Sequence, residues 1–145
     1  MSTLNIDAIE HACQRLINRF AVYNDLGEFD KLAALFSTDG AFARPTAPED
    51  FIVGRDNILH SFTSRPAGKL TRHLITNTVI EVQDADHASA ISYVTQFSAT
   101  PGNPAKFGLK ANSTQLVGEY YDNFVRTPEG WRIAKRSGRV ALMLE

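Results

Sequence analysis

The stretch LTRHLITNTVIEV, residues 70–82, decides the fold. It is rich in β-branched residues and ends at the turn signal QDAD, which is typical of a long β-strand. Three comparable stretches follow it, and the last two are joined by a tight turn at TPEG. We therefore predict a meander of four long antiparallel strands over residues 71–83, 87–99, 113–126 and 131–142.

The first half of the chain is helical in pattern. Apolar residues recur at intervals of three and four over residues 7–26, which predicts an amphipathic helix that ends at Gly27. A second helix is predicted over EFDKLAALF, stopped by the turn signal Thr38-Asp39-Gly40, and a third over GRDNILHSF. Two short strands are predicted at AFARP and FIV. Because helices come first and strands follow, the fold class is α+β.

Composition narrows the class of protein. With 145 residues, 43% of them hydrophobic and 21% charged, the chain is predicted to form one domain over residues 1–145. The formal net charge of −1 does not favour nucleic acid or an anionic membrane as a partner. Cys13 is the single cysteine, so the chain can form no internal disulfide. There is no apolar run of about 20 residues and no signal-peptide pattern, so we expect a cytoplasmic protein.

The strand over residues 71–83 is apolar on both faces. A regular strand places Ile75 and Val79 on one face, and Leu74, Ile80 and Val82 on the other. The helices can cover only one face of the sheet, and an antiparallel strand facing water should alternate more cleanly. We therefore expect the second face to be covered by another copy, in a homo-oligomer that is a dimer or a trimer.

The order of the motifs resembles a known family. The helix ending in an aspartate is followed by FDKLAALFSTDGAF, then TRHLITN, then YYDNFVRTPEGWRIAKRSG. This order is similar to that of the SnoaL-like group of the nuclear transport factor 2-like superfamily, which includes scytalone dehydratase and hexachlorocyclohexane dehydrochlorinase. The resemblance covers nearly the whole chain. It implies a cone-shaped curved antiparallel sheet closed by three N-terminal helices around a pocket, a cystatin-like α+β barrel.

The resemblance also implies site residues. Its dehydratase and dehydrochlorinase members use an Asp–His pair, which matches Asp25 and His73. In the dehydrochlorinase an arginine just after the final tryptophan also lines the site, and it matches Arg136. Asn24 stands where scytalone dehydratase has a tyrosine, so scytalone is not the expected substrate. The residues alone favour a core histidine for His73 and a solvated carboxylate near a helix end for Asp25. For Arg136 they fit half of a surface ion pair at least as well as a site residue.

Further residues are candidates for the wall of a pocket. Tyr23, Asn24, Phe42 and Tyr120 suit a flat apolar ligand, although most aromatic residues at such spacing are core. Asn77 shares a strand face with His73 if the strand is regular. The remaining histidines lack metal-ligand spacing, and there is no phosphate loop or dinucleotide fingerprint. We therefore expect neither a metal nor a cofactor. The connection over residues 100–112 is rich in Pro, Gly and Asn, as in a mobile loop or lid.

Two classes of function fit these observations. The first is a cofactor-independent lyase or isomerase acting on a small apolar cyclic compound, in which Asp25 orients His73 and His73 abstracts a proton. An isomerase or polyketide cyclase would use the same pair. The alternative is a ligand-binding or accessory domain of the same fold without chemistry, because a fold does not settle function.

Overall fold

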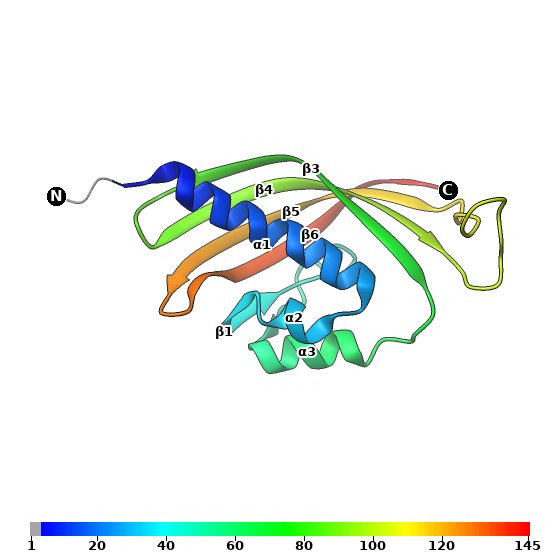
Figure 1. Ribbon diagram of the computed structural model, residues 1–145, viewed down its shortest axis with the longest axis horizontal. Helices are drawn as coiled ribbons and strands as arrows, with labels where there is room; N and C mark the ends of the chain where they lie inside the picture. The colour runs from blue at the N-terminus through cyan, green and yellow to red at the C-terminus, as the bar shows by residue number, and fades with distance from the viewer. Residues whose placement is uncertain (1–3) are drawn as a thin grey trace.

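The computed structural model describes residues 4–145 as three helices packed on one face of a six-stranded sheet (Figure 1). The sheet is curved and unclosed, with the strand order β2-β1-β6-β5-β4-β3, and every neighbouring pair is antiparallel except β1 and β6. This confirms the predicted α+β class. The elements are α1 (Ile6–Leu26), α2 (Phe29–Ala33), β1 (Phe36–Phe42), β2 (Ile52–Val53), α3 (Arg55–Thr63), β3 (Leu70–Val82), β4 (His87–Ala99), β5 (Gln115–Thr127) and β6 (Gly130–Leu144).

Helix α1 lies along the sheet and carries the predicted apolar stripe into the core. Its N-terminus is capped by Asn5, whose side chain accepts a hydrogen bond from the Ala8 N–H at 3.1 Å. Its C-terminus is closed by Gly27 at a φ of +71°, a conformation that glycine adopts at little cost. This stop leaves Asp25 in the last turn, beside β3. The buried residues of α1 are Ile9, Cys13, Leu16, Ile17, Phe20 and Ala21.

The segment after α1 differs from its prediction. Helix α2 ends at Ala33, and the residues predicted to form a turn, Thr38-Asp39-Gly40, lie inside strand β1. Strand β1 runs parallel to β6, and its register shifts between Phe36 and Ala41. Phe36 and Phe42 are both buried in the core, and this packing keeps the segment between them in the sheet. The turn residues therefore form an irregular part of the strand instead of ending it.

Strand β3 contains a bulge that also corrects a prediction. The pairing with β4 shifts between Thr76 and Val79, and Asn77 has a φ of +53°. After the bulge the alternation reverses, so Ile75 and Ile80 both pack against the core, whereas Val79 is exposed. The prediction that Val79 shares a face with Ile75 is therefore wrong. Asn77 is exposed at the bulge, and the regular strand that placed it beside His73 is not formed.

The face of the sheet turned away from the helices keeps apolar side chains exposed. Leu74 is 47% exposed, Val79 57% and Tyr93 47%. The homo-oligomer therefore stays a prediction, with this face as its contact surface. Within residues 4–145 there is no helix of the length and hydropathy needed to cross a membrane.

Candidate functional site

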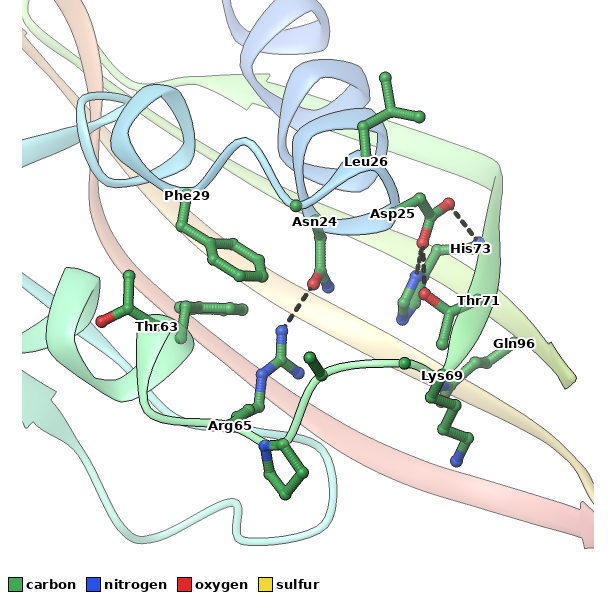
Figure 2. A pocket seen from close by; sticks show the side chains of 15 residues that line it. Asn24, Asp25, Leu26, Phe29, Thr63, Arg65, Lys69, Thr71, His73 and Gln96 are labelled. Carbon is green, nitrogen blue, oxygen red and sulfur yellow. Dashed lines mark hydrogen bonds and ion pairs between the residues drawn. The ribbon is translucent and has the colours of Figure 1, made fainter. Parts of the chain in front are cut away.

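The end of α1 and the start of β3 bring Asp25 and His73 together (Figure 2). The Oδ1 atom of Asp25 lies 2.5 Å from Nδ1 of His73 and accepts a hydrogen bond from the Thr71 hydroxyl at 2.9 Å. Its Oδ2 atom accepts the backbone N–H of His73 at 2.9 Å. Three donors from β3 thus hold one carboxylate, and they offset the unfavourable position of a negative charge at a helix C-terminus.

The same contacts set the state of the histidine ring. The side chains are nearly buried, with 8% of Asp25 and 11% of His73 exposed. A carboxylate can only accept, so Nδ1 of His73 is the donor and, in the neutral ring, Nε2 carries no proton. Nε2 has no hydrogen-bond partner among residues 4–145. His73 therefore presents a free proton acceptor.

His73 lines two adjoining cavities. The larger has a volume of about 730 Å³ and opens between α1, α3 and the segment before β3, and the smaller has a volume of about 280 Å³ and extends between the sheet and the segment after β1. The scale is that of small-molecule sites. The residues that line both are Asn24, Phe62, Arg65, Lys69, His73 and Gln96.

The smaller cavity, called the inner cavity below, has a wall of mixed character. Aromatic and aliphatic side chains form its apolar part, as expected of a small-molecule site. Phe42, one of the predicted pocket residues, lies in this wall and is packed against Phe62 with ring centroids 5.5 Å apart. Polar groups stand among the apolar ones. The inner wall contains Phe42, Phe62, Val94 and Leu116 together with Arg44, Arg65, Gln96 and Tyr120.

Tyr120 also lines the inner cavity. Burial, above all, raises the pKa of its phenol; Arg136 and Arg65 act against that shift, while Asp122 and Asp25 add to it. The phenol therefore keeps its proton at neutral pH, and it can donate a hydrogen bond to an oxygen in the cavity.

Arg136 lies elsewhere. It belongs to β6 directly opposite Asp122 of β5, and its Nε and Nη2 atoms donate to the two carboxylate oxygens at 2.6 and 2.9 Å. Both side chains are fully buried. The guanidinium lies between the rings of Phe20 and Tyr120, 4.4 and 4.1 Å from their centroids. Burial works to lower the pKa of Arg136, but Asp122 raises it above its usual value. Arg136 is not among the residues lining either cavity.

The other predicted residues divide between the cavity and its surroundings. Asn24 lines both cavities, and its Oδ1 accepts a hydrogen bond from Arg65 at 2.9 Å. Tyr23 is not among the residues lining either cavity; it packs against the core and has Lys31 over its ring. Residues 100–112 also lie outside both linings, at the end of β4 (Figure 1).

Several lining residues were missed by the sequence reasoning. Thr71 had a usable signal, because strand periodicity places it on the face of His73. Gln96 lies directly opposite His73 in the pairing of β3 with β4, so strand alignment would have found it. Arg44, Arg65 and Lys69 lie in irregular segments, where no periodicity predicts which way a side chain points.

Among residues 4–145 no three His, Cys, Asp or Glu side chains cluster as a metal site would require. Catalysis without a metal or cofactor stays a prediction.

The curved sheet with three helices on one face and a cavity between them is the nuclear transport factor 2-like, cystatin-like fold. The chain belongs to the SnoaL-like domain family, whose model matches residues 8–137. No curated protein is a significant match to the sequence.

Solved structures agree on the fold. A hexachlorocyclohexane dehydrochlorinase (LinA, type 2) is 19% identical, with a TM-score of 0.78 over 94% of this chain and 87% of its own. A provisionally assigned scytalone dehydratase from Novosphingobium aromaticivorans is 21% identical, with a TM-score of 0.75 over 94% of this chain and 86% of its own. An NTF2-like protein with a cystatin-like fold from the same organism is 21% identical, with a TM-score of 0.73 over 91% and 81%.

Proposed function

We propose that the protein is a cofactor-independent lyase or isomerase that removes a proton from carbon in a small cyclic compound. The observation that carries this proposal is the Asp25–His73 pair, in which the carboxylate binds Nδ1 and the other ring nitrogen, Nε2, faces a cavity. A general base must lie within reach of the carbon acid and be held in one orientation. The names of two similar structures, a dehydrochlorinase and a scytalone dehydratase, support the same reaction class.

In the proposed reaction, His73 Nε2 takes a proton from carbon. In an elimination, the electron pair of the broken C–H bond forms a carbon–carbon double bond, and the leaving group departs with its own bonding pair. In an isomerisation of an unsaturated ketone, the pair is delocalised into the neighbouring carbonyl and the carbon–carbon double bond as a dienolate. The imidazolium then returns the proton at the far carbon, and the double bond shifts. Asp25 stabilises the positive charge that His73 gains. Tyr120 donates a hydrogen bond to the oxygen on which negative charge develops.

This arrangement reassigns the charge-stabilising role predicted for Arg136. The guanidinium of Arg136 is held by Asp122, and it stacks on the ring of Tyr120. We propose that Arg136 is a positioning residue, which fixes Tyr120 in the cavity wall. The alternative of a purely binding domain is less favoured, because a binding site has no need of a histidine oriented by a buried carboxylate.

Hydrogen–deuterium exchange tests the proposal without knowledge of the leaving group. Cyclohexanone, 2-tetralone and 4-oxocyclohexanecarboxylate are incubated with the enzyme in D₂O, and NMR follows exchange at the carbons beside the carbonyl. The expected result is enzyme-dependent exchange of at least one ketone that is lost in His73→Ala. Absence of catalysed exchange with all three, or equal exchange by His73→Ala, would overturn the proposal.

A further inference from the structure

The wall of the combined cavities carries an excess of positive charge. Its cations are Arg44, Arg65 and Lys69, and its single carboxylate is Asp25. Both oxygens of Asp25 are already held by His73 and Thr71. The chain as a whole has a formal net charge of −1, so this concentration of cations is local to the cavity.

Two of the cations are held close to each other by the same aromatic ring. The guanidinium carbons of Arg44 and Arg65 lie 5.2 and 4.5 Å from the centroid of Phe62. Phe62 is buried, so both guanidinium groups lie against one fixed ring. The two charges repel each other, and Arg44 is one cause, after burial, of the lowered pKa of Arg65.

Neither arginine is neutralised by the protein. Arg44 donates from Nη2 to the carbonyl oxygen of Ser61 at 3.0 Å, and Arg65 donates from Nη2 to Asn24 at 2.9 Å. Within residues 4–145, no carboxylate lies within ion-pair distance of Arg44, Arg65 or Lys69. Both arginines use neutral acceptors that hold the side chain in place, and most of their N–H donors remain available.

We propose that the substrate is a small cyclic carboxylic acid, whose carboxylate is bound by Arg44 and Arg65 while its reacting carbon lies against Nε2 of His73. The apolar body predicted for the ligand rests on Phe42, Val94 and Leu116. Paired guanidinium groups match the planar, two-oxygen shape of a carboxylate. This inference rests on the proposed function for its reacting carbon, but its binding step is tested separately.

The first test compares two ligands of equal shape. Benzoate and benzamide differ in charge at one group, and isothermal titration calorimetry measures the binding of each to the full chain. Benzoate is expected to bind saturably to one site per chain, and benzamide at least roughly tenfold more weakly, the factor that about 1.4 kcal/mol produces. Equal affinities, or no saturable binding of benzoate, would overturn the proposal. Tighter binding of phenyl phosphate than of benzoate would replace the carboxylate by a phosphate and so refute the proposed class.

Substitution of the two cavity arginines tests whether they bind the carboxylate. Arg44→Gln and Arg65→Gln are each expected to weaken benzoate roughly tenfold, with little effect on benzamide. Arg126→Gln is the matched control, because Arg126 is an exposed arginine outside both cavities. Benzoate affinity that stays at the wild-type value in both cavity variants would show that these arginines are not the site.

One further variant separates this inference from the proposed function. Asp25→Asn removes a negative charge from the cavity wall, so benzoate should bind at least as tightly as to the wild type, although exchange of ketones is lost. If that variant keeps exchange activity, the proton-abstraction mechanism fails and the acid site stands. If the wild type catalyses exchange but does not prefer benzoate over benzamide, the acid site fails and the mechanism stands.

Discussion

Two aspartates each bind a basic side chain, but only one of the two pairs leaves its basic group facing a cavity. Asp122 binds Arg136 through two parallel hydrogen bonds, and both side chains are fully buried. Asp25 binds His73 through one ring nitrogen, and the other nitrogen is left facing a cavity. The guanidinium of the first pair keeps its positive charge, whereas the imidazole of the second pair can act as a base.

Arg136 and His73 also differ in what surrounds them. Arg136 is enclosed by the rings of Phe20 and Tyr120, so its charge is balanced by Asp122 and does not reach a ligand directly. His73 lies at the edge of the sheet, in its outermost strand, and the cavity lies beside it. Removal of one partner from a buried ion pair leaves an uncompensated charge in the interior, while a base beside a cavity is available for chemistry. Breaking the Asp25–His73 pair is therefore expected mainly to lower activity, and breaking the Asp122–Arg136 pair mainly to lower stability.

The largest effect is expected on activity, from the loss of the pair at the cavity. His73→Ala and Asp25→Asn should each slow deuterium exchange of a reactive ketone by about 10²–10⁴-fold, the usual contribution of a general base. Their thermal unfolding should remain cooperative, because His73 is beside a cavity rather than within the core.

The surface of the protein offers a matched control for this prediction. His87 and Asp84 form another Asp–His contact at 2.9 Å, but 60% and 59% of their side chains are exposed. His87→Ala and Asp84→Asn should leave exchange unchanged. A rate in His87→Ala as low as that of His73→Ala would show that the pairing at the cavity has no special role.

The stability of the folded protein is expected to depend more on the Asp122–Arg136 pair. Arg136→Ala leaves Asp122 as an unpaired buried carboxylate, which should lower the free energy of unfolding by about 3–5 kcal/mol. Urea denaturation measures the change, with Arg139→Ala as a control because Arg139 is exposed and contacts Glu119 at 3.5 Å. A loss below about 1 kcal/mol, typical of exposed pairs, would contradict the buried character of this pair.

The helices and strands could be predicted from the sequence better than the residues of the site. Periodicity placed α1 and β4 almost to the residue, because each has one long buried face. It failed at β1, where core packing of Phe36 and Phe42 overrode a turn signal, and at Asn77, where a bulge broke the strand register. Asp25 could be selected only through the family resemblance, since its partners lie 46 and 48 residues away.

A smaller effect is expected when both members of the buried pair are replaced together. Asp122→Leu with Arg136→Met substitutes apolar side chains for the ions, so no charge is left without a partner, and such replacements are often neutral or stabilising. The double variant should recover most of the stability lost in Arg136→Ala in urea denaturation. If Arg136 positions Tyr120, exchange activity should stay below that of the wild type. Full recovery of both stability and activity would remove the positioning role.

The smallest effect concerns the third donor to Asp25. Thr71→Val keeps the shape of the side chain and removes the hydroxyl that donates to Oδ1 at 2.9 Å. The carboxylate retains both contacts to His73, so it stays in place but turns more freely, and the ring is held less firmly. Exchange should slow by roughly tenfold, corresponding to about 1.5 kcal/mol for one hydrogen bond to a charged group. Because Thr71 acts through Asp25, the loss should fall on kcat with KM unchanged, whereas a loss confined to KM would make Thr71 a ligand-binding residue instead.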